Sequence, residues 1–277
     1  LFLVPFIGVE VKGSKRWIDL FFLPRFQPIE VLKPFLIIIL ATILCDIKSN
    51  ILFKYLLSIF VISVISLLLI AQPDIGQTLL VVFCWAVLIF TSGINIYILL
   101  AIFIAGASLL TYLIIYVPKF DYIQGRIFSF FNREIGTHNF QSDKAIESIT
   151  SGGFFGKGIG EGVLKNRVPE AHTDYIISVI SEEFGVVAIM LILLLFLILI
   201  YMVFKKISFE TNDKVKLILI GSISLILMQA TIHIGVNIRL LPTTGMTLPF
   251  LSYGGSSIIS TSILAGIILN LTKRKIN

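Results

Sequence analysis

The segment "PEAHTDYIISVISEEFG", residues 169–185, places several carboxylates directly before an apolar stretch. On a helix, Asp174, Ser178 and Glu182 stand at positions i, i+4 and i+8, and therefore share one face. A carboxylate at the partly dry edge of a membrane has its ionisation perturbed, which is what a general base requires. The alternative is that Asp174 only caps the helix N-terminus. The spacing leaves both interpretations open.

A basic segment near the start of the chain could supply the positive charge that an anionic substrate needs. "EVKGSKRWIDL", residues 10–20, holds three basic residues beside Trp17, namely Lys12, Lys15 and Arg16. An arginine suits bidentate phosphate binding, while a lysine acts more as a point charge. Trp17 is typical of a membrane-interface anchor. Contact of these side chains with lipid head groups is the alternative interpretation.

A glycine-rich segment, "TSGGFFGKGIGEG", covers residues 150–162 and has six glycines in the eleven residues from Gly152. It is not a P-loop, because Lys157 is followed by Gly158 where a serine or threonine is required. The glycines could allow tight turns and close packing at the membrane surface. They could instead expose backbone N–H groups that cradle a phosphate.

Other charged residues near the apolar stretches favour structural roles. Glu30 and Lys33 lie one helical turn apart, which predicts an ion pair. Asp74 follows a proline at the end of one apolar run, so it could cap the next helix. Glu182 and Glu183 lie near membrane depth, where an acidic residue needs a reason to be present. We expect them to pair within the helix bundle rather than to react.

The composition identifies the class of protein. Of 277 residues, 57% are hydrophobic and only 14% are charged, too few to cover a soluble surface, so the chain is an integral membrane protein. The net charge of +6 fits the positive-inside rule and anionic lipids rather than nucleic acid. Cys45 and Cys84 stand in apolar runs and are expected to be buried thiols. The apolar start at Leu1 resembles the end of a spanning helix that begins earlier.

The uncharged runs predict an all-α integral membrane protein, a polytopic helical bundle with seven full spans and one partial span. About 20 helical residues cross a hydrocarbon core of about 30 Å. We expect one membrane domain over 1–277, a partial span at 1–8, and a large extracytoplasmic loop at 118–174. The full spans are predicted near 29–45, 51–71, 75–92, 96–117, 175–204, 216–236 and 253–271. Lysines between and after these spans place the loops at 9–28 and 118–174 outside.

Two other site chemistries find little support in the sequence. His233 and Ser256 could be the base and nucleophile of an intramembrane protease, but neither has a local motif or a third orienting group. His138 stands alone in a polar loop and is expected to be solvated. No cluster of His, Cys and carboxylate residues has metal-ligand spacing, so no dedicated metal site is expected.

Several motifs together resemble the SEDS family, the FtsW/RodA/SpoVE peptidoglycan glycosyltransferases. They run from near residue 8 to near residue 257 in the order and spacing of that family. The motifs are "GVEVKGSKRWI", "QPIEVLK", "QPDIG", "YIQGRIFSFFN", "FQSDKAIESITSGGFFGKGIGEG", "PEAHTDYIISVISEEFG" and "LLPTTGMTLPFLSYGGSS". Ten spans are typical of the family, which implies that about two and a half precede this sequence. Ile29 and Pro34 depart from the family pattern.

The resemblance implies an activity and a catalytic residue. Such proteins polymerise lipid II into glycan strands with undecaprenyl pyrophosphate as the leaving group. The essential acidic residue of the family falls on Asp174, which would be the general base on the 4-hydroxyl of the acceptor sugar. The expected substrate-binding residues are Lys12, Lys15, Arg16, Gln27, Arg126, Gln141, Lys157, Glu170, His172, Thr173, Thr244, Ser252 and Ser256.

The resemblance also implies partners and a location. A class B penicillin-binding protein, a transpeptidase, and other division proteins would be the partners, in the bacterial cytoplasmic (inner) membrane at the septum. "GMTLPFLSYGGSS" and "SEEFG" resemble the division members more than the elongation members. No cofactor is certain, although a loosely bound divalent cation, Mg²⁺ or Mn²⁺, could assist.

Two other function classes remain as alternatives. A lipid II flippase needs charge along a path through the bundle, whereas here the charge gathers at the outer face and most spans are bare. A scaffold that only recruits other proteins would not need Asp174. The sequence therefore favours surface chemistry by an enzyme.

Overall fold

The computed structural model describes residues 1–11, 14–20, 23–46, 50–131 and 140–273. The chain divides into two compact units. Unit 1 consists of Leu1–Ile96, Leu199–Met228 and Gly254–Asn277, and unit 2 consists of Tyr97–Ile198 and Gln229–Tyr253. The single membrane domain expected from the sequence stays a prediction.

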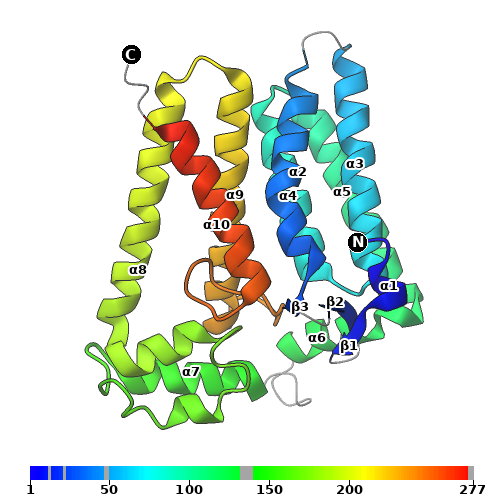
Figure 1. The fold of residues 1–277 in the computed structure, drawn as a ribbon. Helices are drawn as coiled ribbons and strands as arrows, with labels where there is room; N and C mark the ends of the chain where they lie inside the picture. Colours follow the sequence, from blue (N-terminus) through cyan, green and yellow to red (C-terminus); the bar gives the residue numbers. More distant parts are fainter. Residues whose placement is uncertain (12–13, 21–22, 47–49, 132–139, 274–277) are drawn as a thin grey trace. The chain divides into compact units, whose positions relative to one another are not determined.

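Unit 1 begins with a short helix and a small antiparallel sheet (Figure 1). The elements are α1 (Val4–Ile7), β1 (Val9–Val11), β2 (Ser14–Leu20) and β3 (Leu23–Phe26). Val9 pairs with Trp17 across the first two strands. A Cβ at Gly8 would lie 2.3 Å from the Val4 carbonyl oxygen, so only glycine fits where the helix passes into the sheet. The prediction of an all-α chain did not include these strands.

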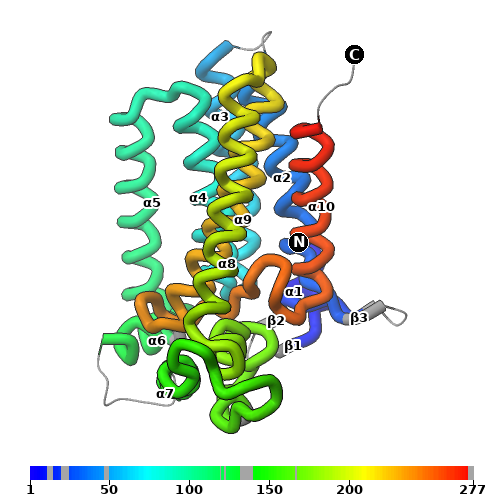
Figure 2. The backbone as a smooth tube through the Cα atoms, turned by 90° about the vertical axis from the view of Figure 1, so that its left-hand side faces the viewer, coloured from blue at the N-terminus to red at the C-terminus, as the bar shows by residue number. Residues whose placement is uncertain are grey.

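Besides the short α1, the described residues of unit 1 contain four whole helices: α2 (Pro28–Leu44), α3 (Ile51–Ala71), α4 (Ile75–Thr91) and α10 (Gly255–Thr272). Figures 1 and 2 show α10 beside α2, and the two helices are in contact. The first part of α9 (Asp213–Asn237) packs closely against this group. A Cβ at Gly221 of α9 would lie 2.7 Å from Ile37 Cγ2 and 3.1 Å from Leu88 Cδ2.

Unit 2 contains the long polar connection expected at 118–174 and the helices on either side of it. Its elements are α5 (Ile96–Tyr116, from Tyr97), η1 (Pro118–Phe120), α6 (Asp121–Phe131), α7 (Phe140–Gly152) and η2 (Leu164–Arg167), with the start of α8 (Ile176–Phe209) and the end of α9. Ile177, Ala230 and Leu248 form a buried apolar cluster. This cluster joins α8, α9 and the loop after α9.

Helix α8 is divided at Gly185, whose φ of 73° and ψ of −173° are not helical. Before this break stand Glu182 and Glu183. After it, residues 186–204 contain no Asp, Glu, Lys or Arg and cover about 28 Å at 1.5 Å per residue. Figure 2 shows α7 and the loop after it at the end of α8 where the helix begins. The membrane span of α8 therefore starts near Val186.

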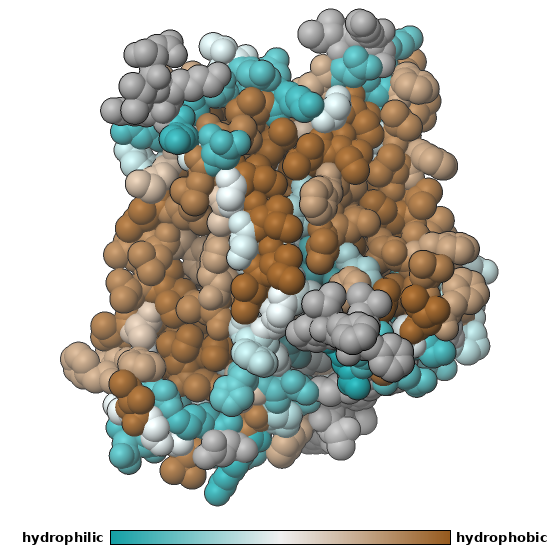
Figure 3. All heavy atoms as spheres, in the orientation of Figure 1, coloured by the Kyte–Doolittle hydropathy of each residue, from teal (hydrophilic) through white to brown (hydrophobic). Residues whose placement is uncertain are grey.

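The predicted helices are confirmed within a few residues, while the exact number of spans stays a prediction. Within the described residues, five helices are long and apolar enough to cross a membrane: α3, α5, α8, α9 and α10. Helices α2 and α4 have 17 residues each, somewhat short for a core of about 30 Å. Figure 3 shows hydrophobic residues over the helix bodies and hydrophilic ones near their ends.

Candidate active site

Asp174 lies in a tight turn, residues 170–175, which we call the Asp174 turn. The carbonyl oxygen of Glu170 accepts the N–H groups of Thr173 (3.1 Å), Asp174 (3.1 Å) and Tyr175 (3.3 Å). Glu170 has a φ of 56°, in the left-handed region that costs a non-glycine residue roughly 1–2 kcal/mol. Such strain persists where the surrounding structure enforces it, often at functional sites. Asp174 is half-buried.

Helix α9 holds the backbone of this turn with its last residue. The Asn237 side-chain amide donates to the carbonyl oxygen of Asp174 (3.0 Å) and to that of His233 (2.9 Å). His233 Nδ1 lies 2.7 Å from the Met246 carbonyl oxygen, so Nδ1 is the donor. One turn earlier in α9, the Gln229 side-chain amide donates to the carbonyl oxygen of Thr247 at 3.0 Å, in the loop that also contains Met246. These three side chains, four residues apart, form a polar face on the second half of α9.

The loop after α9 holds the two residues before Asp174. The Ser252 hydroxyl donates to the carbonyl oxygen of Thr173 (2.7 Å) and accepts the N–H of Leu248 (2.7 Å). The N–H of Tyr253 donates to the carbonyl oxygen of His172 (2.9 Å). Together with the bond from Asn237, three consecutive carbonyl groups are fixed from two elements. Donors from α9 and from the loop after it therefore fix the backbone of the turn.

The Asp174 carboxylate lies near the loop after α9, since a Cβ at Gly245 would come 3.6 Å from its Oδ2. Burial, followed by the charge of Asp174, raises the pKa of Tyr175, while Arg126 acts in the opposite direction. Both charges therefore lie near the Tyr175 phenol. Arg126 of α6 also donates to the Thr243 carbonyl oxygen (3.2 Å). The Tyr175 phenol thus has a carboxylate and a guanidinium in its surroundings.

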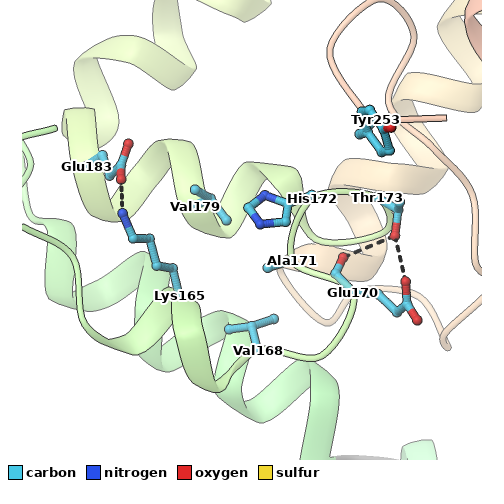
Figure 4. Close-up of a pocket in the computed structure, with 9 residues that line it drawn as sticks. All are labelled: Lys165, Val168, Glu170, Ala171, His172, Thr173, Val179, Glu183 and Tyr253. Atoms are coloured by element: carbon cyan, nitrogen blue, oxygen red, sulfur yellow. Dashed lines mark hydrogen bonds and ion pairs between the residues drawn. The ribbon is translucent and has the colours of Figure 1, made fainter. Parts of the chain in front are cut away.

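A pocket of about 700 Å³ opens beside the Asp174 turn (Figure 4). Three expected substrate-binding residues line it, namely Glu170, His172 and Thr173. In Figure 4 the imidazole of His172 lies between Val179 and the turn, and an ion pair of Lys165 with Glu183 forms another wall. The lining residues that the sequence analysis missed are Lys165, Val168, Ala171, Val179 and Tyr253; Glu183 was expected only to pair.

Glu182 fastens the connection after α7. Its carboxylate accepts the N–H groups of Leu164 (2.9 Å) and Lys165 (2.6 Å) and the Ser148 hydroxyl (3.0 Å). Lys157 Nζ lies 3.5 Å from Glu182 Oε1. The Glu182 side chain is fully buried, so these partners offset the cost of removing its charge from water. The expectation that Glu182 is paired is thus confirmed, although its partners lie in α7 and the connection after it.

The glycines of this connection serve close packing, as one of the two interpretations predicted. A Cβ at Gly156 would lie 2.2 Å from the Glu183 carbonyl oxygen, and one at Gly152 would lie 1.9 Å from that of Ser181. No side chain fits at these distances. A phosphate cradle in this loop stays a prediction.

Unit 1 contains a separate polar group, the buried ion-pair cluster, made of Arg16, Gln27, Glu30, Lys33, Asp74 and Gln77. Glu30 and Lys33 form the predicted ion pair, with 2.7 Å between Oε2 and Nζ. The Gln77 amide bridges them, since its Nε2 donates to Glu30 (2.7 Å) and its Oε1 accepts from Lys33 (3.2 Å). Both charged side chains are almost completely buried.

Asp74 forms the outer half of the cluster and caps α4 as predicted, accepting the N–H of Gln77 at 3.3 Å. Gln27 donates to its other oxygen at 2.9 Å. Arg16 Nη1 lies 3.6 Å from Asp74 Oδ1, and Arg16 Nη2 donates to the Pro73 carbonyl oxygen. Burial raises the pKa of Asp74, and the Arg16 guanidinium opposes this shift. The predicted roles of Arg16 and Gln27 in substrate binding stay predictions.

The other predicted site residues fall into three groups. Lys12 lies outside the described residues. Lys15 is exposed on β2 and Ser256 is buried in α10, both in unit 1. In unit 2, Gln141 is half-buried at the start of α7, and Thr244 adjoins the loop residue that faces Asp174. Among the residues the structure describes, no three His, Cys, Asp or Glu side chains are placed to hold a metal ion.

The α9 residues that position Asp174 were not predicted from the sequence. Gln229, His233 and Asn237 recur at intervals of four along an apolar stretch, the same helical spacing that drew attention to Asp174. His233 was weighed only as the base of a protease. The spacing of these three residues was the signal that could have identified a polar helix face.

Comparisons with known proteins agree on one family. A family model described as "Cell cycle protein", FtsW/RodA/SpoVE, matches residues 1–277. "Probable peptidoglycan glycosyltransferase FtsW" of Caulobacter vibrioides is 33% identical over 98% of this chain and 69% of that protein. The protein of the same name from Francisella salina is 36% identical over 97% of this chain and 68% of its own length.

Solved structures of similar fold cover the whole chain. A chain in "Structural coordination of polymerization and crosslinking by a peptidoglycan synthase complex" matches with a TM-score of 0.80 and 28% identity, over 100% of this chain and 78% of that one. The rod shape determining protein RodA of Thermus thermophilus matches with a TM-score of 0.69 and 28% identity, over 100% of this chain and 75% of its own.

Proposed function

The chain belongs to the FtsW/RodA/SpoVE family of cell cycle proteins, and we propose on that premise that it polymerises lipid II into glycan strands. Its relatives are named peptidoglycan glycosyltransferases. The observation that carries the proposal for this chain is the Asp174 turn. Three consecutive backbone carbonyls are held there by Asn237, Ser252 and Tyr253, which presents a carboxylate on a fixed backbone.

Asp174 acts as the general base in this proposal. Its carboxylate takes the proton from the 4-hydroxyl of the acceptor sugar as that oxygen bonds to the anomeric carbon of the donor. The bond from the anomeric carbon to the pyrophosphate breaks at the same time, and its electron pair leaves with undecaprenyl pyrophosphate. Attack from the face opposite the leaving group inverts the anomeric carbon. A well-placed general base contributes about 100- to 10,000-fold to such a step.

Arg126 supplies positive charge in the same unit. It lies close enough to Tyr175 for its charge to lower the pKa of that phenol, against the effect of Asp174. Its bond to the Thr243 carbonyl oxygen fixes the guanidinium near the loop that faces the base. A fixed cation stabilises the charge that develops on a departing pyrophosphate. Among the described residues, no three His, Cys, Asp or Glu side chains are placed to hold a metal ion, and assistance by a loosely bound divalent cation stays a prediction.

The pocket beside the turn would hold part of the substrate. Its volume of about 700 Å³ falls in the usual range of ligand pockets, about 300–1,000 Å³. His172 and Tyr253 offer flat faces for stacking on a sugar ring, and Lys165 offers a donor. The proposal extends to a class B penicillin-binding protein as partner and to the division septum as location, in line with the FtsW names and the synthase complex.

The test uses the purified chain with a class B penicillin-binding protein and fluorescent lipid II in vesicles. Two quantities are measured: glycan length on a gel, and movement of lipid II between leaflets. The wild type is expected to make long glycan, and the Asp174→Asn variant is expected to make none. Glu147→Gln, on the exposed side of α7, is the control and should keep activity. Movement of lipid II by the wild type without any glycan would overturn the proposal in favour of a flippase.

A further inference from the structure

The glycine-rich loop after α7 carries large apolar side chains that point away from the core of unit 2. Phe154 is 75% exposed, Phe155 85% and Ile159 78%. Lys157 lies between Phe155 and Ile159, and Glu161, of opposite charge, follows Ile159. Two adjacent exposed phenylalanines on a loop that is otherwise tightly hydrogen-bonded need a partner, because exposed apolar patches mark contact surfaces.

The position of this pair along α8 is fixed by the backbone. The N–H of Val186 donates to the carbonyl oxygen of Gly153 (3.0 Å), and that of Val187 to the carbonyl oxygen of Phe154 (3.2 Å). A Cβ at Gly185 would lie 2.2 Å from the Phe154 carbonyl oxygen. The loop therefore lies directly against the break in α8 and cannot slide along the helix.

That position is the edge of the membrane. Residues 186–204 contain no Asp, Glu, Lys or Arg and belong to a helix apolar enough to span a bilayer. Val186 and Val187 are themselves 41% and 53% exposed. Phe154 is thus held level with the first turn of a lipid-facing helix, and its apolar surface continues that of α8.

We propose that Phe154 and Phe155, the Phe tip, insert into the boundary between head groups and acyl chains of the bilayer. Phenylalanine is among the residues that interfacial segments bury at this depth. Lipid is the occupant because the tip adjoins a surface that already faces lipid. Since the charges of Lys157 and Glu161 cancel, apolar contact rather than lipid charge holds the tip.

Insertion would also fix the position of the pocket wall relative to the membrane surface. Beyond the tip, the N–H of Gly158 donates to the Glu183 carbonyl oxygen (3.0 Å), and that of Gly160 to the Glu183 carboxylate (3.2 Å). Glu183 pairs with Lys165 in the pocket. If the proposed function holds, the tip keeps this wall level with the head groups, where the pyrophosphate of a lipid-linked sugar lies.

The experiment measures depth by spin labelling of the full chain in lipid nanodiscs. A label is attached at Phe155→Cys in a background without the two native cysteines. Matched labels at Leu191→Cys, exposed on α8, and Glu161→Cys, exposed on the same loop, report lipid and water. At each label we measure the ratio of collisions with oxygen to collisions with a polar nickel chelate. This ratio should be at least about twofold higher at Phe155 than at Glu161. It should be lower at Phe155 than at Leu191.

Two outcomes contradict the insertion, and a third contradicts the statement that apolar contact holds the tip. A ratio at Phe155 equal to that at Glu161 places the tip in water. A label shielded from both reagents means that protein covers the tip. A shift in depth between nanodiscs of phosphatidylcholine and of phosphatidylglycerol means that lipid charge holds it. Thermal unfolding of each labelled variant confirms the fold. Because depth is read without turnover, a chain that makes no glycan but shows the predicted depth refutes the proposed function and not the insertion.

Discussion

The two polar regions of this membrane protein use their hydrogen bonds differently. In the buried ion-pair cluster of unit 1, the side chains of Glu30, Lys33 and Gln77 bind one another. In the Asp174 turn of unit 2, the anchoring bonds go to backbone carbonyls. The side chains of Glu30 and Lys33 are almost completely buried, whereas Asp174 is half-buried and Glu170 and His172 are exposed.

Under the proposed function, the difference distinguishes a site that holds helices together from a site that binds a substrate. A buried charge that binds other side chains contributes to the stability of the fold. Its loss leaves the oppositely charged side chain buried without compensation. A backbone that is fixed through its carbonyls presents its side chains at defined positions. Substitutions in the first region should therefore affect stability, and those in the second should affect turnover.

Lys33→Met should have the largest effect on stability. It leaves the Glu30 carboxylate buried without its cation, which costs about 3–5 kcal/mol. The matched control is Lys216→Met, which removes an exposed ion pair of the same i,i+3 spacing and should cost no more than about 0.5 kcal/mol. Thermal unfolding in detergent measures both. Equal shifts of the thermal unfolding midpoint in the two variants would mean that the cluster does not stabilise the helices.

Gly156→Ala should disturb the loop beside the pocket more than Gly153→Ala. Both glycines have positive φ, but a Cβ at Gly156 would meet the Glu183 carbonyl oxygen at 2.2 Å, while nothing lies within 4 Å of one at Gly153. The first substitution should cost more than about 2 kcal/mol, and the second only the strain of about 1–2 kcal/mol. The readout is the midpoint of thermal unfolding. The reverse order would contradict the close packing.

Glu182→Gln should loosen the same connection. An amide nitrogen would replace one of the oxygens that accept the N–H groups of Leu164 and Lys165, at a cost of about 1–3 kcal/mol. Glu147→Gln is the control, since that side chain is exposed on α7 and its ion pair is worth about 1 kcal/mol or less. Trypsin cleavage after Lys157 should accelerate in the first variant. Similar cleavage rates in both would rule out Glu182 as the fastening residue.

Asn237→Leu should have a small effect on stability and a larger one on turnover. The Asp174 carbonyl loses its donor, which costs about 1 kcal/mol. A shift of the turn by a fraction of an ångström should lower kcat about tenfold with KM unchanged. Thr231→Ala, exposed on the same helix, is the control. Unchanged kcat in Asn237→Leu would show that α9 does not position the base.

The sequence was sufficient for the helices and for local pairs. Uncharged runs located the spans because lipid tolerates few charges, and the spacing of Glu30 and Lys33 predicted their ion pair. The strands near the N-terminus could not be predicted, because three short strands with turns have no periodicity to distinguish them from a loop. Helices α6 and α7 were missed within the long polar connection for a similar reason.

The candidate site could be predicted only in part. Asp174 stood out by its residue type and its place before an apolar run. Its anchors come from residues 63 to 79 positions further along the chain, and no local pattern specifies which elements meet. The glycines beside the pocket predicted close packing, but not that Glu182 and Glu183 would be the partners.

The most direct test of the account is steady-state turnover of lipid II by Asp174→Asn, compared with the wild type. The account predicts a fall in kcat of about 100-fold or more, with KM within about twofold and the midpoint of thermal unfolding unchanged, because the backbone anchors of the turn remain. A variant that keeps the wild-type kcat would show that the base is another group. A variant that unfolds at lower temperature would show that Asp174 serves the fold, as the buried ion-pair cluster does.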